Sequence, residues 1–206
     1  CYMKKKIATM MFVLGLCVST VLGGCGKKDA DSSAESANTE SGDSADDSQG
    51  DGSTFSNLNT FSCETMDGGM FTQDDFANKD LTVMNFWMTT CAPCVQEMPK
   101  LEEIRGTLPD NVQMVLVCLD ADTEEEAAKE IIGRTGYTGL VTKSGDGDME
   151  KVNSQILYVP TTLLFDAEGN RVGSTIVGSS PDLEGVYTEA INTALSEMDK
   201  EAEWKK

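Results

Sequence analysis

The sequence contains no histidine in 206 residues. Histidine is the side chain most often used as a general base near neutral pH, and it is the commonest zinc ligand. Its absence excludes catalysis by a Ser-His-Asp triad or by a Cys-His pair. The seven cysteines do not form an even disulfide framework, so each has to be interpreted from its own position.

Positive charge is also scarce. Sixteen lysine and arginine residues stand against 35 aspartate and glutamate residues, which gives a formal net charge of −19 at pH 7. A surface this acidic repels nucleic-acid phosphates and anionic lipid headgroups. We therefore expect no nucleic-acid partner, and the simplest consequence of the charge is solubility.

The first 24 residues have the features of a secretory signal peptide. Lys4 to Lys6 form a positive region, and the apolar run from Ile7 to Leu22 is short and rich in small residues. The run ends in Leu22-Gly23-Gly24-Cys25, which resembles the lipobox of bacterial lipoproteins. That resemblance implies a diacylglyceryl group on Cys25, whose two acyl chains would anchor the protein to a membrane. The alternative is a plain cleaved signal followed by an unmodified cysteine.

Residues 25–54 are predicted to be a disordered tether. Lys27 to Ser53 consists almost wholly of small, polar and acidic residues, with no aromatic and no large aliphatic side chain. Such a segment cannot bury enough apolar surface to fold. We therefore divide the chain into a signal peptide (1–24), a lipidated acidic tether (25–54) and a folded domain (55–206).

The pattern of apolar residues from about Phe55 onward predicts one α/β domain. Leu81–Trp87 and Val112–Leu119 are apolar runs typical of buried strands, and Pro93–Leu108 has helical periodicity. The other expected elements are a hairpin around Asp67-Gly68-Gly69, a short helix at 74–78, a helix at 123–135 capped by Thr123 and Glu126, a helix at 149–156, strands at 161–165 and 171–177, and a last helix from Pro181 or Asp182 towards Glu203. This order predicts a central mixed sheet flanked by helices.

The candidate reactive site is Cys91-Ala92-Pro93-Cys94, between a buried strand and the start of a helix. A CxxC pair in this setting is typical of thiol–disulfide exchange. The free N–H groups and partial positive charge of a helix N-terminus stabilise a thiolate and lower its pKa. Cys91 is therefore expected to attack, and Cys94 to resolve the mixed disulfide. Pro93 suits the first helical turn, and because it lacks an N–H it favours a reducing couple.

Two other interpretations of the CxxC are half of a zinc site and a structural disulfide. A structural zinc site needs four ligands, and the sequence offers neither a histidine nor a second CxxC. A CxxC loop is short, and such bridges are strained and labile rather than stabilising. We expect no metal, and no cofactor other than the redox-active disulfide Cys91–Cys94.

Several motifs of the sequence, in the same order along the chain, resemble those of the TlpA/ResA-like extracytoplasmic thioredoxins. The resemblance covers about residues 55–200. It rests on Val83-Met84-Asn85-Phe86-Trp87, the CxxC, Glu97-Met98-Pro99 and Val159-Pro160-Thr161-Thr162. It implies a thioredoxin fold with an N-terminal β-hairpin and an inserted strand–helix element.

The same resemblance implies roles for individual residues. A cis peptide bond is expected before Pro160, where an ordinary trans proline is the alternative. The substrate groove is expected at Trp87, Ala92, Pro93, Val159 and Pro160, with Trp87 packed beneath the site. Glu97 would assist proton transfer, unless it only complements the helix dipole. Asn85 replaces the buried aspartate of general thioredoxins, and Thr90 replaces the aromatic residue that usually precedes the first cysteine.

Cys63 and Cys118 lie outside the CxxC. Cys118 falls in an apolar strand and is expected to be an inert core thiol. A Cys63–Cys118 disulfide is an alternative in an oxidising compartment.

Taken together, the features predict an extracytoplasmic thiol–disulfide oxidoreductase, in the first instance a reductase of protein disulfides. The resemblance implies an integral-membrane thiol electron donor (CcdA/DsbD-like) and a lipid-anchored location on the outer face of the bacterial cytoplasmic membrane. We expect a monomer. The alternatives are an oxidant that introduces disulfides, a thioredoxin-fold binding module with a vestigial CxxC, and peroxidase-like chemistry at a cysteine near an arginine. The resemblance allows two processes that would use the electrons, cytochrome c maturation and repair of oxidised proteins, and the sequence does not select between them.

Overall fold

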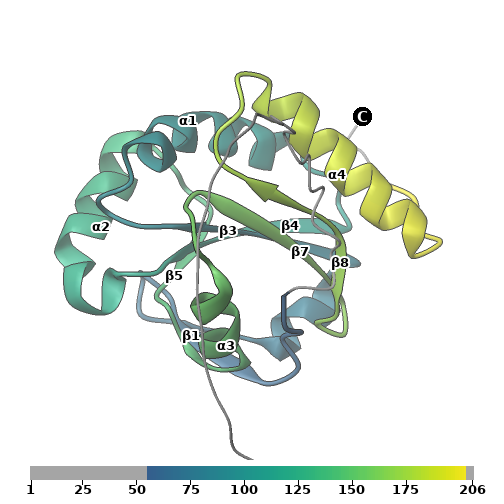
Figure 1. Ribbon diagram of the computed structural model, residues 1–206, viewed down its shortest axis with the longest axis horizontal. Helices are drawn as coiled ribbons and strands as arrows, with labels where there is room; N and C mark the ends of the chain where they lie inside the picture. The colour runs from purple at the N-terminus through teal and green to yellow at the C-terminus, as the bar shows by residue number, and fades with distance from the viewer. Residues whose placement is uncertain (1–54, 203–206) are drawn as a thin grey trace, which may run out of the picture. The chain divides into compact units, whose positions relative to one another are not determined.

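The computed structural model describes residues 55–202 (Figure 1). The predicted signal peptide, Cys25 and the tether all lie outside the described residues. The elements, in chain order, are β1 (Phe61–Glu64), β2 (Met70–Thr72), the 3₁₀ helix η1 (Gln73–Asn78), β3 (Leu81–Trp87), α1 (Ala92–Thr107), β4 (Val112–Cys118), α2 (Ala121–Thr135), β5 (Leu140–Thr142), β6 (Asp146–Gly147), α3 (Asp148–Gln155), β7 (Thr161–Asp166), β8 (Arg171–Val177) and α4 (Leu183–Glu197). Within residues 55–202, none of the helices has the length and apolar character that a membrane span requires.

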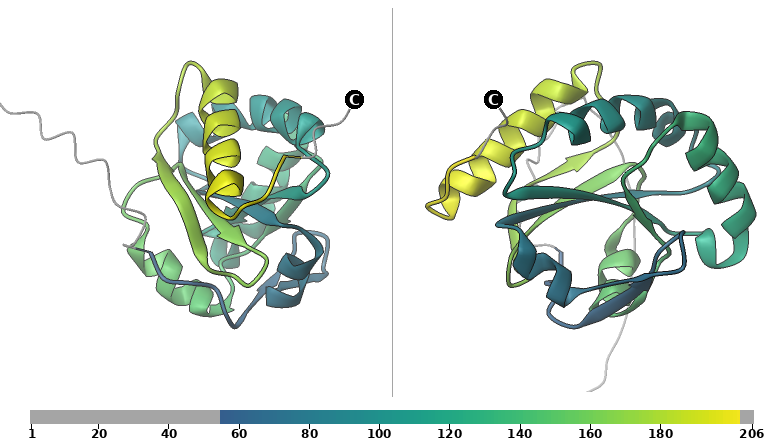
Figure 2. Two further views of the ribbon diagram at one scale, coloured as in Figure 1. Left: turned by 90° about the vertical axis from the view of Figure 1, so that its right-hand side faces the viewer. Right: turned by 180° about the vertical axis from the view of Figure 1, so that it is seen from behind.

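A five-stranded sheet forms the centre of the domain, with strand order β5-β4-β3-β7-β8. Strands β3, β4 and β5 are parallel, whereas β7 runs antiparallel to β3 and β8 antiparallel to β7. Helices α1 and α4 cover one face, and α3 lies with the β1–β2 hairpin on the other (Figure 2). The predicted mixed sheet flanked by helices is therefore confirmed.

All seven residues of the central strand β3 are buried, because both faces of the sheet are covered. Side chains along a strand alternate between the two faces. Val83 and Trp87 accordingly belong to the core cluster under α1, α2 and α4. Met84 and Phe86 belong to the second cluster, which holds the aromatic rings of the hairpin and η1. The continuous apolar run in the sequence thus serves two cores at once.

The β1–β2 hairpin is where the sequence places it, and it turns at Gly68 with φ +86. Its strand β1 also pairs with the short strand β6, which makes a second, three-stranded sheet. The end of the hairpin reaches the outer edge of β5. Met66 N donates to Val141 O at 2.9 Å, and Lys143 N donates to Glu64 O at 2.9 Å. The hairpin therefore covers one edge of the central sheet, while β8 forms the other edge.

Two predicted helix boundaries are wrong. Helix α2 begins at Ala121 with Asp120 at its N-cap, and Thr123 lies inside it, next to a break in the helical backbone at Glu124. The predicted cap at Thr123 does not form, because its hydroxyl instead donates to Asp120 O at 3.1 Å. Helix α4 ends at Glu197, well before Glu203, where Lys200 N closes the end by donating to Leu195 O at 2.8 Å.

Between α2 and β7 the chain adds β5, β6 and α3. This is the region where the family resemblance implied an inserted strand–helix element. The helix expected at 149–156 is α3, whereas the positions of the two short strands were not predicted from the sequence. Both are only two or three residues long, too short to show the alternation that identifies a strand.

Candidate active site

Cys91 and Cys94 form a disulfide at the start of α1, with an S–S distance of 2.00 Å. Cys91 has extended backbone angles and is the N-cap of the helix, and Cys94 N donates to Cys91 Sγ at 3.2 Å. The two sulfurs differ in access, because Cys91 is partly exposed whereas Cys94 is only 1% exposed. The arrangement presents the Cys91 sulfur to a partner and aims a backbone N–H at it.

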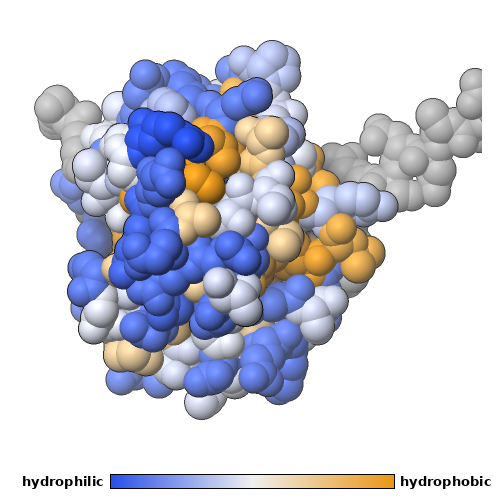
Figure 3. Space-filling view, turned by 90° about the vertical axis from the view of Figure 1, so that its left-hand side faces the viewer, coloured by the Kyte–Doolittle hydropathy of each residue, from blue (hydrophilic) through white to orange (hydrophobic). Residues whose placement is uncertain are grey.

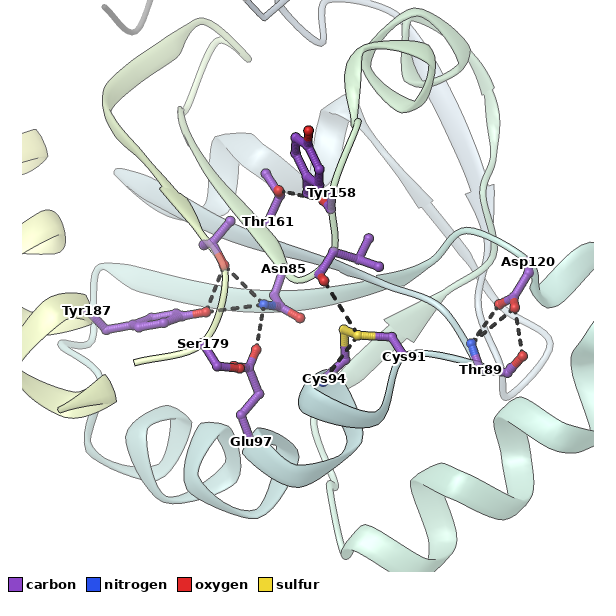
Figure 4. The surroundings of a disulfide bond; sticks show 12 residues. Asn85, Thr89, Cys91, Cys94, Glu97, Asp120, Tyr158, Thr161, Ser179 and Tyr187 are labelled. Carbon is purple, nitrogen blue, oxygen red and sulfur yellow. Dashed lines mark hydrogen bonds between the residues drawn. A yellow bond between two sulfur atoms is a disulfide. The ribbon is translucent and has the colours of Figure 1, made fainter. Parts of the chain in front are cut away.

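The segment before β7 lies across the disulfide from α1 (Figure 4). Its Val159–Pro160 peptide bond is cis, as the family resemblance implied. Val159 O lies 3.6 Å from Cys91 Sγ. Among the predicted groove residues, Ala92 and Pro93 are exposed and Val159 is half-buried, while Pro160 is buried. Trp87 is fully buried in the same core cluster as Cys94, so it lies beneath the site and not on the groove surface.

Glu97 is 8% exposed and lies one helical turn after Cys94. Each of its carboxylate oxygens has a donor. Asn85 Nδ2 lies 3.3 Å from Oε1, and Ser179 Oγ lies 2.8 Å from Oε2. Burial raises the pKa of Glu97 above its usual value, although both donors oppose that rise. A carboxyl group held in this way can take up and release a proton nearer to neutral pH.

Asn85 joins Glu97 to a buried hydroxyl pair that the sequence did not reveal. Its Nδ2 lies 3.0 Å from Thr162 Oγ1 and 3.2 Å from Tyr187 OH. The two hydroxyls are 2.7 Å apart, and either can be the donor. An amide nitrogen carries two hydrogens, so Asn85 satisfies two of its three possible acceptors at a time. Burial raises the pKa of Tyr187 well above its usual value, which leaves Glu97 as the member of this network that titrates first.

Ser179 reaches the site from the segment between β8 and α4. Gly178 makes the turn at the end of β8 with φ +80, a backbone conformation that favours glycine, and its N–H donates to Pro160 O at 2.8 Å. A cleft of about 500 Å³ lies between this segment and α1. Its lining includes Pro93, Gln96, Glu97, Lys100, Ser179 and Leu183. The cleft gives solvent a path to the Glu97 carboxyl group.

A second polar cluster, also missed in the sequence, holds the chain just before Cys91. Thr89 donates its backbone N–H and its hydroxyl to the carboxylate of Asp120, with the hydroxyl at 2.6 Å (Figure 4). Cys118 Sγ lies 3.2 Å from Asp120 Oδ1. An acid directly after a buried strand, level with the CxxC turn, was the available signal.

Cys63 and Cys118 are both buried and free. They belong to different core clusters on opposite faces of the sheet, so the alternative of a Cys63–Cys118 disulfide is wrong. Burial raises the pKa of Cys63 to about 12 and also raises the pKa of Cys118. Both are neutral thiols at physiological pH. Residues 55–202 gather no set of three or more acidic or cysteine side chains that could hold a metal ion.

Two large side chains that directly precede Val159 in the chain are exposed. Leu157 is 81% exposed and Tyr158 is 72% exposed, immediately before Val159. Ile156 packs against one core cluster and Val159 against the other, so the segment is anchored at both ends. The face that lies on the left in Figure 1 is mostly hydrophilic, with apolar side chains gathered in a few small groups (Figure 3).

Comparisons with known proteins agree with this geometry. A model of the Redoxin family matches residues 41–191. Thioredoxin-like protein YneN of Bacillus subtilis is 28% identical over 112 residues, which are 53% of this chain and 63% of YneN. Thiol-disulfide oxidoreductase ResA of Bacillus thuringiensis is 28% identical over 104 residues, which are 50% of this chain and 58% of ResA. The match thus spans less than two thirds of each of these relatives.

The crystal structure of StoA from Bacillus subtilis aligns with a TM-score of 0.53 and 23% identity, over 65% of this chain and 97% of StoA. At that identity the likeness concerns the fold alone. The thioredoxin fold predicted from the sequence is confirmed.

Proposed function

The chain belongs to the Redoxin family, and from that premise we propose that it is a thiol–disulfide oxidoreductase that acts through Cys91 and Cys94. The observation that carries the proposal is the Cys91 sulfur at the N-cap of α1, partly exposed and 3.2 Å from the Cys94 N–H. A thiolate there is stabilised by the N–H group and by the positive end of the helix dipole.

In the reductase direction, the Cys91 thiolate attacks one sulfur of a substrate disulfide. A Cys91–substrate disulfide forms, and the other substrate sulfur leaves as a thiolate. The Cys94 thiolate then attacks Cys91 Sγ and expels the second substrate thiolate. Two electrons pass to the substrate, and the Cys91–Cys94 disulfide is regenerated. Because Cys94 is buried, its thiol needs an acceptor for its proton, and Glu97, one turn away, is the proposed acceptor.

Separate substitutions of the two cysteines test this proposal. Cys91→Ser should lower the reduction of a protein disulfide by dithiothreitol to the uncatalysed rate. Cys94→Ser should retain the first step and accumulate a covalent mixed disulfide, visible by mass spectrometry. Cys63→Ala is the matched control, because Cys63 is a buried thiol away from the CxxC. Full function in Cys91→Ser would instead support the binding-module alternative.

The reductase direction is proposed because Pro93 withholds one N–H donor from the Cys91 thiolate. The alternative is an oxidant that introduces disulfides. The reduction potential of the pair separates the two. A value near the thioredoxin end, roughly −270 mV, supports a reductase, and a value near roughly −120 mV supports an oxidant.

Protein disulfides are the proposed substrates, with a monomer as the working form. The half-buried Val159 offers backbone groups to an extended chain beside Cys91, and the exposed Leu157 and Tyr158 offer apolar surface.

The structure does not favour peroxidase-like chemistry, which expects an arginine beside the reactive cysteine, because each arginine binds another group. Arg105 pairs with Glu102, Arg134 pairs with Glu130, and Arg171 donates to backbone carbonyls. Consumption of hydrogen peroxide by the reduced protein would instead support peroxidase-like chemistry.

The proposal includes a location on the outer face of the cytoplasmic membrane, with Cys25 lipidated and an integral-membrane thiol donor (CcdA/DsbD-like) supplying electrons. Its support is the lipobox-like sequence Leu22-Gly23-Gly24-Cys25. Cys25→Ala should move the protein from the membrane fraction to the soluble fraction of cells. An unchanged distribution would favour the plain cleaved signal.

A further inference from the structure

The turn that carries Cys91 is bound to a carboxylate from the neighbouring strand. The parallel register pairs Trp87 of β3 with Cys118 of β4, and Leu119 N continues the pairing by donating to Trp87 O at 2.9 Å. Both strands end there. Thr89 follows one strand and Asp120 the other, so the register brings these two residues level with each other.

Three donor groups surround the carboxylate of Asp120. Thr89 N lies 3.0 Å from Oδ1 and 3.1 Å from Oδ2 of the carboxylate, and Thr89 Oγ1 lies 2.6 Å from Oδ2. Cys118 Sγ approaches Oδ1 at 3.2 Å. Burial alone would raise the pKa of Asp120, but the hydrogen bonds from Thr89 and Cys118 outweigh it and leave the pKa below its usual value. The group is therefore a carboxylate at neutral pH.

The main chain of Asp120 is fixed as well. Its carbonyl accepts from Thr123 N and Glu124 N at the start of α2. On the other side, the turn that contains Thr89 closes where Cys91 N donates to Met88 O at 3.0 Å. Asp120 thus ties the Met88–Cys91 turn to the first residues of α2.

This connection matters most when the Cys91–Cys94 bond is open. In the disulfide form, the S–S bond itself holds Cys91 over the start of α1. In the dithiol and in the mixed disulfide that link is gone, and the Met88–Cys91 turn has to position the sulfur. In the dithiol Cys91 can be a thiolate, and in the mixed disulfide it has just reacted as one. In both states the Asp120 carboxylate accepts hydrogen bonds from Thr89, two residues before Cys91.

We propose that Asp120 is a positioning residue of the dithiol site, which fixes the Met88–Cys91 turn through Thr89 and opposes the Cys91 thiolate with its charge. The biological meaning of this inference rests on the proposed function. Two other ionisable groups surround the site. The Cys118 thiol contacts Asp120 from β4 and stays neutral, and Glu97 approaches from α1 on the opposite side of the disulfide (Figure 4).

The charge is tested in the full chain with Asp120→Asn, which keeps the size of the side chain and an acceptor for Thr89. We expect the pKa of Cys91 to fall by about 0.5 to 1, because a nearby like charge is removed. The pKa is read from the pH dependence of iodoacetamide alkylation, followed by mass spectrometry of the peptide that contains Cys91. Above the wild-type pKa, the equilibrium constant for reduction of the pair should rise by the same factor, about three- to tenfold.

Asp122→Asn is the matched control, because it removes the same charge from the same helix. Asp122 is exposed and accepts from the Ser144 hydroxyl, away from the turn. The control should leave both quantities at their wild-type values. An Asp120→Asn protein with an unchanged Cys91 pKa, or equal shifts in the two variants, overturns the charge effect.

The positioning effect is tested at Thr89. An aromatic disulfide reacts with the reduced protein in two steps. Cys91 displaces one aromatic thiolate, and Cys94 then displaces the second as the protein disulfide closes. The closing step is intramolecular, so it depends on where the turn holds Cys91. We expect closure to slow about three- to tenfold in Thr89→Val and to keep its wild-type rate in Thr89→Ser, which retains the hydroxyl. Equal rates in the two variants overturn the positioning effect.

None of these measurements needs a protein substrate. If the chain fails to reduce proteins while the Asp120 and Thr89 variants shift as expected, the proposed function falls and the positioning role stands. If the chain reduces proteins while these variants match wild type, the reverse holds.

Discussion

Glu97 of α1 and Asn85 of β3 face each other in the core, with Asn85 Nδ2 3.3 Å from Glu97 Oε1. General thioredoxins carry an acid where this chain has Asn85. A neutral amide there leaves Glu97 as the buried carboxyl group beside the dithiol. Within this network the ionisable carboxyl group therefore lies on α1, the helix that begins at the CxxC, and several predictions depend on it.

Glu97→Gln should flatten the pH dependence of stability. The folded-state pKa of Glu97 is raised, chiefly by burial, so above the usual glutamate value of about 4.3 the native state binds more protons than the unfolded state. Stability from this group is therefore full below that pH and is lost as pH rises through the folded pKa. Urea unfolding of wild type and Glu97→Gln at a series of pH values measures the difference. Parallel curves would contradict a raised pKa.

Ser179→Ala should shift the pH–rate profile to higher pH. The Ser179 hydroxyl donates to Glu97 Oε2 at 2.8 Å and favours the ionised carboxyl group, so its loss raises the pKa of Glu97 further. The acid limb of the rate of mixed-disulfide resolution should move upward with it. Ser180→Ala is the control, because Ser180 Oγ accepts from Asp182 N and does not bind Glu97. A profile that stays in place would remove Ser179 from the site.

Tyr158→Ser should weaken the use of protein disulfides and spare small ones. Tyr158 is 72% exposed beside the half-buried Val159, and contact with an apolar substrate side chain would bury it. We expect kcat/KM for a polypeptide disulfide to fall about tenfold, with little change for oxidised glutathione. Met70→Ser is the control, since Met70 is 60% exposed in the other sheet. Equal losses for both substrates would assign the effect to the dithiol and not to docking.

Among the four cysteines in residues 55–202, brief alkylation of the reduced native protein should be confined to Cys91. Cys63 has a pKa of about 12, Cys118 has a raised pKa, and both are fully buried. A thiol that is neither ionised nor accessible reacts slowly. Peptide mass spectrometry after brief treatment with iodoacetamide should find label on Cys91, whose side chain is partly exposed, and on all four cysteines after denaturation. Rapid native labelling of Cys63 would show that its cluster opens readily.

The strongest patterns in the sequence predicted the largest part of the fold. Apolar runs gave β3 and β4, the turn residues at Asp67-Gly68-Gly69 gave the hairpin, and the CxxC marked the start of α1. These features are local, so each is visible in a short window. The boundaries of α2 and α4 were missed because backbone hydrogen bonds set them, to Asp120 O at the start of α2 and to Leu195 O after α4, and the side-chain pattern does not show these bonds.

The polar partners of the site were missed because they lie far apart in the chain. Asn85, Thr162 and Tyr187 are separated by up to 102 residues, yet they meet around one amide group. No spacing rule joins a strand, a second strand and a C-terminal helix, because only the sheet order brings them together. By contrast, Cys91 and Cys94 were found at once, since their chemistry requires them to be close in the chain.

The way the hairpin covers β5 has a consequence for the behaviour of the domain in solution. Unpaired strand edges recruit strands from other molecules and start aggregation. The backbone bonds at Met66 and Lys143 remove one of the two edges of the central sheet. A truncated chain that lacks residues 61–72 would expose that edge, and we expect it to self-associate even if the dithiol site were intact. The hairpin thus protects the β5 edge of the central sheet against polymerisation. This edge lies at the opposite end of the strand order from β8.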